Sequence, residues 1–337
     1  MTCFHPIKVY RHLSDHDPVT GKWPIRFEKH AHHSHAVCEF EVPCGKCYGC
    51  RMARAREWAL RLYLESIYYD DKCFVTMTYD DDHLPADGNL SKVHCQKFIK
   101  RLRKSIGIPV RYFLCGEYGS TTFRPHYHMI LLGYEFPDLF RYNETESGTL
   151  YTSELCDRLW SLGECKIGLV TEASIGYTTA YCNKKLGYTM ADYERAGIQP
   201  EFVLMSTRPA IGSQFWIDNR NSLMELDGMF MKDGVRVSLP RIFNKRWQAE
   251  FAESYDKVKL QRMLKMYDRR TKLFNDKERQ QYQTITNGLK KISNYFDLKL
   301  LEHARGAIID SRNRAVRRAK EATALSLAGL YSNRSKL

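Results

Sequence analysis

The stretch PHYHMILLG, residues 125–133, decides how the central part of this chain folds. Two histidines alternate at its start and an apolar run follows, a pattern typical of a β-strand. Because residues i and i+2 of a strand project from the same face, His126 and His128 are expected to converge. Two neighbouring imidazoles predict a divalent-metal site that also needs a carboxylate and open positions. The alternative is an edge strand whose histidines face solvent.

The preceding segment, VRYFLCGEYG at residues 110–119, is also expected to form a strand. The polar link STTFR separates the two segments and allows them to pair as a hairpin. Such pairing brings Glu117, near the end of the first strand, towards the two histidines. Glu117 is therefore the predicted third metal ligand.

Strand and helix patterns alternate on both sides of this hairpin. The expected strands cover residues 72–79, 110–119, 125–133 and 165–173, and the expected helices cover residues 51–69, 93–107, 152–163 and 174–187. This alternation predicts an α+β catalytic domain over residues 51–243. Residues 244–337 are almost wholly helical and basic in pattern, so we expect a helical C-terminal tail there.

The helix expected over residues 174–187 carries three residues suited to nucleophilic chemistry. Tyr177, Tyr181 and Lys184 fall at positions i, i+4 and i+7, which lie on one face of a helix. A tyrosine hydroxyl attacks only when it is deprotonated or faces an activated phosphate, so it needs a metal and a nearby cation. The histidine pair and Lys184 offer both. The alternative is a surface stripe or a row of half-buried core aromatics.

A cluster of cysteines marks the N-terminal region. Cys44, Cys47 and Cys50 form two consecutive C-x-x-C steps, whereas a structural zinc site needs four ligands. Candidates for the fourth ligand are Cys3, Cys38, His5, His30, His32, His33 and His35. We expect residues 1–50 to form a small Cys/His-rich subdomain with a zinc site, built with Cys3 as the first choice. The alternative is a reduced cysteine-rich turn or a redox pair.

The overall charge favours a polyanionic partner. Lys and Arg number 52 against 39 Asp and Glu, a net charge of +13, which suits nucleic acid through neutralisation of phosphates. The alternative is that the excess charge only keeps the protein soluble, and for the basic tail that it forms a solvated helical face. The sequence has no G-x-x-x-x-G-K-[ST] motif of an ATP-driven helicase. It also lacks a secretion signal and a membrane-spanning apolar run, so we expect an intracellular protein without a membrane partner.

Taken in chain order, four segments resemble the HUH endonuclease superfamily, and most closely the replication initiators of gokushoviruses, small single-stranded DNA phages of the Microviridae. These segments are FVTMTYDDDHLP (74–85), GEYG (116–119), RPHYHMILLG (124–133) and YTTAYCNKKLG (177–187). CGKCYGCR with the following EWALR, and MSTRPAIG, are similar to further segments of those initiators. The resemblance covers roughly residues 1 to 215. It implies an HUH fold, a central antiparallel sheet flanked by helices that is a palm-like relative of the RNA-recognition fold.

The resemblance also implies an activity, the nicking of origin DNA in rolling-circle replication. Mg²⁺ or Mn²⁺ is expected at the predicted triad, and a tyrosine attacks the DNA to leave a covalent 5′-phosphotyrosine that is later religated. Related initiators can carry a lysine where this chain has Ala180, so the two tyrosines are expected to differ. We expect Tyr181 to start the reaction and Tyr177 to act second, with Lys184 beside them.

Further contacts and partners follow from the same resemblance. Expected DNA contacts are Thr76, Thr78, Arg124, Lys185 and Arg208. Expected partners are single-stranded and supercoiled phage origin DNA, and a helicase, polymerase and single-strand-binding protein of the host, in the host bacterial cytoplasm. Two rival hypotheses are a plasmid or transposon HUH nuclease and a zinc-containing regulator that binds DNA or RNA.

Overall fold

The structure is a computed structural model. It describes residues 3–12, 24–28, 37–119, 121–145, 148–180, 190–231, 233–271, 280, 317 and 320–323. The chain divides into two compact units, the sheet unit (residues 52–243) and the terminal unit (residues 1–51 and 244–337). The expected roles of three separate regions stay a prediction. In the described part of the chain, no helix is both long enough and apolar enough to cross a bilayer.

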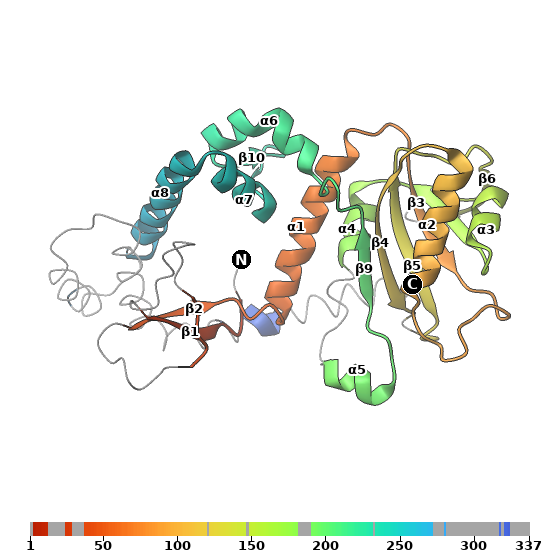
Figure 1. The fold of residues 1–337 in the computed structure, drawn as a ribbon, viewed down its shortest axis with the longest axis horizontal. Coiled ribbons are helices and arrows are strands. Elements are labelled where there is room, and N and C mark those ends of the chain that lie inside the picture. Colours follow the sequence, from red (N-terminus) through yellow and green to blue (C-terminus); the bar gives the residue numbers. More distant parts are fainter. Residues whose placement is uncertain are drawn as a thin grey trace. The chain divides into compact units, whose positions relative to one another are not determined.

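A seven-stranded antiparallel sheet forms the centre of the sheet unit (Figure 1). Its strand order is β6-β7-β8-β3-β5-β4-β9. The strands are β3 (Lys72–Thr78), β4 (Arg111–Tyr118), β5 (Pro125–Leu132), β6 (Phe140–Thr145), β7 (Gly148–Thr152), β8 (Cys165–Leu169) and β9 (Phe202–Met205). Helices flank this sheet, so the expected α+β class with a central antiparallel sheet is confirmed.

Helices and two short strands complete the described elements. The helices are α1 (Tyr48–Ser66), α2 (Lys92–Ile106), α3 (Glu154–Trp160), α4 (Glu172–Ala180), α5 (Met190–Ala196), α6 (Ser213–Leu226), α7 (Arg241–Glu250) and α8 (Ala252–Thr271). The strands β10 (Met229–Phe230) and β11 (Arg236–Val237) pair with each other. Local sequence sets helix ends: the Ser91 side chain caps the start of α2, and Gly107 ends it in the left-handed conformation that glycine adopts without strain.

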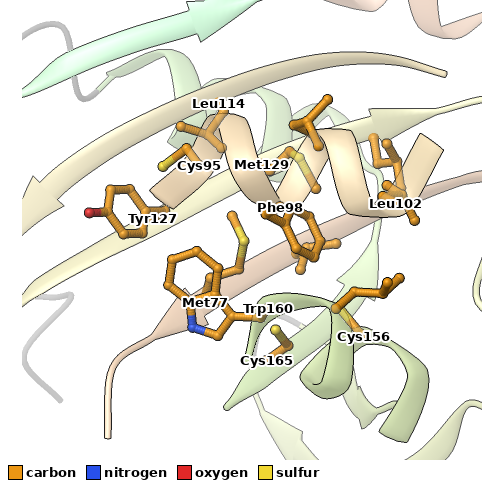
Figure 2. Close-up of a cluster of buried hydrophobic side chains, with 14 of the residues drawn as sticks. Met77, Cys95, Phe98, Leu102, Leu114, Tyr127, Met129, Cys156, Trp160 and Cys165 are labelled. Atoms are coloured by element: carbon orange, nitrogen blue, oxygen red, sulfur yellow. The ribbon is translucent and has the colours of Figure 1, made fainter. Parts of the chain in front are cut away.

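One face of the sheet packs against α2 and α3. Alternate residues of β3 are buried, and Met77 joins Met129 of β5 in the main core. Figure 2 shows Phe98 and Leu102 of α2 gathered with Trp160 of α3 in this cluster. The apolar side chains of β3 and β5 on this face fix the register, because a shift by one residue would turn them to the other side.

The opposite face of the sheet is apolar at one end and polar at the other. Ile130 and Leu132 of β5 pack with Phe113 of β4 against Leu62 of α1 and Ile175 of α4. Further along β5, the same face carries the histidines, because they share the alternation of Ile130 and Leu132. The apolar end therefore holds the helix α4 against the sheet beside the histidines.

A buried ionic network ties α1 to β4. Glu65 of α1 is 4% exposed and forms an ion pair with the guanidinium of Arg111. The second carboxylate oxygen of Glu65 accepts a hydrogen bond from the Gly212 amide at 2.7 Å. Arg61, one helical turn earlier, donates from Nε to the carbonyl of Ile211 at 3.0 Å. These contacts fix the segment before α6 to both α1 and the sheet.

The terminal unit contains a hairpin that sequence patterns did not predict. β1 (Ile7–His12) and β2 (Val37–Val42) pair antiparallel, with Ile7 opposite Val42. The helical C-terminal pattern is found in α7, which spans the boundary between the units, and in α8. Trp247 of α7 is buried and contacts Tyr255 of α8, with ring centroids 5.8 Å apart.

Candidate active site

The pairing of three strands assembles the predicted metal ligands. β4 and β5 form the expected hairpin, in which Glu117 lies directly opposite His126. β3 pairs with the other edge of β5 and places Thr76 opposite His128 and Thr78 opposite His126. Because directly paired residues project from the same face, these five side chains share one surface of the sheet.

The carboxylate of Glu117 lies between the two imidazoles. Its Oε1 is 2.8 Å from Nε2 of His126 and 3.1 Å from Nε2 of His128. Glu117 is 2% exposed and His128 is 5% exposed, whereas 19% of the His126 side chain is exposed. The three residues therefore form a largely buried triad that reaches solvent on the His126 side.

Hydrogen bonds at the far nitrogens orient both rings. Nδ1 of His126 lies 3.1 Å from the carbonyl oxygen of Arg124. A carbonyl only accepts, so Nδ1 is the protonated nitrogen and Nε2 keeps its lone pair in the neutral ring. Nδ1 of His128 is held by the hydroxyl of Thr76 at 3.0 Å. Both rings thus direct Nε2 to the point that Glu117 also faces, the arrangement of metal-binding histidines.

The donor set fits a divalent cation. One ligand atom each from Glu117, His126 and His128 lies within 4.8 Å of the others. Neighbouring ligands of an octahedral ion with bonds of about 2.1 Å are about 3.0 Å apart. The separations of 2.8 and 3.1 Å from the carboxylate oxygen to the two ring nitrogens match that spacing. A carboxylate and two imidazoles with open positions are a ligand set for Mn²⁺ or Mg²⁺.

The helix α4 places one of the predicted tyrosines beside this triad. The ring of Tyr177 lies against His128, with centroids 5.1 Å apart and planes at 79°. Phe74 of β3 stacks on the same imidazole, with centroids 5.6 Å apart. Tyr177 is 47% exposed, so an incoming substrate can reach it. Tyr181, Lys184 and Lys185 lie outside the described residues.

The tyrosine between the two histidines has a different role. Tyr127 projects to the opposite face and is fully buried in the main core. Its hydroxyl lies 2.8 Å from that of Tyr79 and accepts a hydrogen bond from the Ser91 amide at 2.8 Å. Burial raises the pKa of Tyr79 to about 12 and raises the pKa of Tyr127. Both phenols therefore stay protonated and structural at neutral pH.

The residues expected to contact DNA are not gathered in one place. The Arg124 guanidinium is paired with Asp81 at 2.7 Å. The Thr78 hydroxyl donates to the carbonyl of Glu164 at 3.1 Å. Arg208 is exposed in the segment after β9, and no described contact brings it to the triad. Their roles in DNA binding stay predictions.

The histidine face also carries a basic residue that sequence analysis overlooked. Lys166 of β8 lies directly opposite Thr76 of β3, so its side chain starts from the same face as His128. Its ammonium is 3.0 Å from Glu164 and 3.9 Å from the centroid of the Tyr142 ring. The alternation of CKIGL, with Lys166 between two buried residues, was the available signal.

Comparisons with known proteins agree with this architecture. The family described by the replication-associated protein ORF2 matches residues 72–186, a segment that contains the triad and α4. Replication-associated protein ORF2 of Spiroplasma virus 4 is 31% identical over 293 residues, which cover 79% of this chain and 87% of the relative. Replication-associated protein VP4 of Bdellovibrio phage phiMH2K is 33% identical over 257 residues, which cover 71% and 80%.

A more distant relative extends the comparison. Replication-associated protein ORF4 of Chlamydia phage 1 is 25% identical over 226 residues, which cover 64% of this chain and 56% of the relative. No solved structure matches the chain. Because two phage proteins exceed 30% identity across most of both sequences, this chain belongs to the family of replication-associated proteins and is a gokushovirus-type replication initiator, as its motifs predicted.

Proposed function

We propose that this initiator nicks a specific site in single-stranded phage origin DNA by tyrosine attack and later rejoins the ends to complete rolling-circle replication. The observation that supports this most strongly is the convergence of Glu117, His126 and His128 on one sheet face, with Tyr177 against His128. A cation site and a phenol side by side suit phosphodiester transfer, in which a nucleophile must meet a phosphate whose charge is offset.

Glu117, His126 and His128 are the residues that would hold Mg²⁺ or Mn²⁺. A bound divalent ion supplies positive charge that stabilises the phosphate oxygens as negative charge develops on them. Glu117 contributes one negative charge and the two neutral imidazoles contribute none. The donor set therefore leaves a net positive charge to face the DNA.

The covalent step exchanges one phosphodiester for another. The phenolic oxygen of a tyrosine bonds to the phosphorus and loses its proton, while the bond from phosphorus to the 3′ oxygen breaks and that oxygen gains a proton. The products are a 5′-phosphotyrosine and a free 3′-hydroxyl that a polymerase can extend. The linkage conserves the energy of the broken bond, so rejoining needs no nucleotide triphosphate.

Two tyrosines allow the cycle to close. Tyr181 starts replication, and Tyr177 attacks the origin once it is regenerated, so that the released 3′-hydroxyl closes the displaced strand into a circle. Tyr177 already lies beside His128, and Tyr181 follows it by four residues in the sequence. Lys184 stabilises the phenolate form of its neighbour by its positive charge.

The substrate and partners follow from the charge and the family. The net charge of +13 favours single-stranded and supercoiled origin DNA in the host bacterial cytoplasm. A host helicase unwinds the duplex, because the sequence has no P-loop motif for ATP. Host polymerase and single-strand-binding protein then act on the two strands that the nick separates.

The test is cleavage of labelled single-stranded oligonucleotides that tile the phage origin. We expect one cleavage site with Mn²⁺, none with EDTA, and a rate at least about 100-fold lower for Glu117→Gln, which removes the charged ligand. Glu164→Gln is the matched control, because Glu164 is an exposed carboxylate paired with Lys166 and not with the histidines. Cleavage that persists in EDTA, or that falls equally in both variants, would exclude the metal site as the centre of the reaction.

A further inference from the structure

We propose that Cys3, Cys44, Cys47 and Cys50 hold one structural Zn²⁺ ion that ties the N-terminal hairpin to the first turn of α1. This site lies within the terminal unit and is independent of the proposed DNA cleavage. Sequence spacing identified three of the ligands, and the fold brings the fourth from a position 41 residues before Cys44.

The sulfur positions are those of ligands around one tetrahedral ion. The Sγ of Cys3 is 3.6 Å from that of Cys44 and 3.8 Å from that of Cys47, and the Sγ atoms of Cys44 and Cys50 are 4.0 Å apart. All four lie within 4.8 Å of one another. Tetrahedral Zn²⁺ with Zn–S bonds of about 2.3 Å separates its sulfurs by about 3.8 Å. A disulfide needs about 2.05 Å between sulfurs, and all four thiols are free.

The backbone explains why distant cysteines meet. The antiparallel pairing of Ile7 with Val42 brings the residues before β1 next to the residues after β2. Cys3 therefore lies across the open end of the hairpin from Cys44. Gly45 has a φ of +73°, a conformation that favours glycine, and turns the chain between Cys44 and Cys47.

Backbone amides surround the sulfurs. The amide of Cys44 donates to the sulfur of Cys3 at 3.3 Å, and the amide of Phe4 donates to that of Cys47 at 3.4 Å. The sulfur of Cys44 accepts from the amides of Lys46 and Cys47 at 3.4 and 3.3 Å. Such donors stabilise thiolates, the form in which cysteine binds metal, and they fix the direction of each ligand.

The surroundings favour a single zinc ion over the alternatives. An iron–sulfur cluster is larger than one ion and holds its cysteine sulfurs further apart. His5, a rival for the fourth position, is bonded through Nε2 to Glu321 at 2.8 Å. The rival Cys38 side chain and the histidines at 30, 32, 33 and 35 lie outside the described residues. Among the described residues, Cys3 is the one that completes the set.

The ion has a physical purpose in this part of the fold. A two-stranded hairpin is only marginally stable by itself in water, because it buries little apolar surface. A tetrathiolate zinc site contributes folding free energy directly and would fix the hairpin to the start of α1 at Tyr48.

The first experiment measures zinc in the full-length protein, purified in reducing, chelator-free buffer, by mass spectrometry of the elements. We expect about one Zn²⁺ per chain, and less than about a tenth of that in Cys3→Ala and in Cys47→Ala, because three thiolates bind zinc far more weakly than four. Cys156→Ala is the control, since Cys156 is a buried cysteine of α3 outside the cluster, and it should keep the full content.

The second experiment uses Co²⁺ in place of zinc and does not depend on whether a variant folds. The wild-type protein should show the sulfur-to-cobalt charge-transfer bands and strong visible bands of a tetrahedral tetrathiolate. Cys3→His should retain the metal and shift the bands, because an imidazole can replace a thiolate. A wild-type protein with no zinc and no such bands, or a cobalt spectrum unchanged in Cys3→His, would overturn the proposal.

Discussion

The hydroxyl oxygen of Thr76 lies 3.0 Å from Nδ1 of His128, its direct cross-strand partner. That contact turns Nε2 of the same ring towards Glu117, 3.1 Å away. Threonine at this position of β3 was expected from sequence to touch DNA, whereas its position in the structure suits orientation of a metal ligand. We therefore expect Thr76 to be a positioning residue of the triad.

Replacing Thr76 by valine keeps the shape of the side chain and removes its hydrogen bond to His128. The Mn²⁺ concentration for half-maximal nicking should rise about tenfold or more, because outer contacts of this kind hold metal ligands in place. Thr76→Ser keeps the hydroxyl and should stay near wild type. Titration of the nicking rate with Mn²⁺ measures both.

Thr78→Val is the matched control, because the Thr78 hydroxyl bonds to the Glu164 carbonyl and not to a histidine. Equal metal requirements in the two valine variants would show that the bond to His128 does not orient the ring.

Tyr127→Phe separates the stability of the histidine strand from its chemistry. The substitution leaves the buried Ser91 amide and Tyr79 hydroxyl without their partner and should lower the free energy of unfolding by about 1–3 kcal/mol in urea titrations. Nicking at 25 °C should stay within about twofold of wild type, because the phenol lies on the face opposite the triad. Loss of nicking with unchanged stability would place Tyr127 in the reaction instead.

Glu65→Ala should be among the most destabilising single changes in the sheet unit. It removes the partner of the buried Arg111 guanidinium and of the Gly212 amide, a loss of about 3 kcal/mol in the free energy of unfolding. Glu194→Ala, at an exposed carboxylate of α5, should change that energy by no more than about 0.5 kcal/mol. Chemical denaturation of both variants makes the comparison, and similar values for the two would contradict the network.

Lys166→Ala tests whether the histidine face carries the DNA backbone. If the ammonium neutralises one phosphate, the slope of log affinity against log salt for single-stranded DNA should fall by about 0.7, whatever the sequence. Lys104→Ala provides the control, because Lys104 is exposed at the end of α2, which packs on the other face. A slope unchanged by Lys166→Ala and reduced by Lys104→Ala would move the DNA to the α2 side.

The sequence allowed the core of the candidate site to be predicted because its contacts are local and periodic. β4 and β5 are joined by a short link, so alternation within each strand was enough to bring Glu117 to the histidines. The apolar side chains that follow His128 also identified which face of β5 is polar. Helices with a strong apolar face, such as α2, were placed within a few residues for the same reason.

Contacts between distant segments could not be predicted in this way. β9 pairs with β4 across a wide sequence gap, and a strand of four residues carries little periodic signal. The choice of Cys3 over other candidates depends on the register of β1 with β2, which only the fold sets. The role of Thr76 likewise depends on which strand borders β5, and not on its own sequence.

The most direct test of tyrosine attack at the metal site is to map the covalent adduct. Wild-type protein is incubated with an origin oligonucleotide and Mn²⁺, then digested, and mass spectrometry identifies the peptide that carries the nucleotide. We predict a 5′-phosphotyrosine on Tyr181, its loss in Tyr181→Phe, and an adduct that persists in Tyr177→Phe with linear or over-length products. Adduct lost in Tyr177→Phe and kept in Tyr181→Phe would reverse the order of the two tyrosines. No adduct with any origin-derived strand, or an adduct that survives in the variant lacking both tyrosines, would contradict the account.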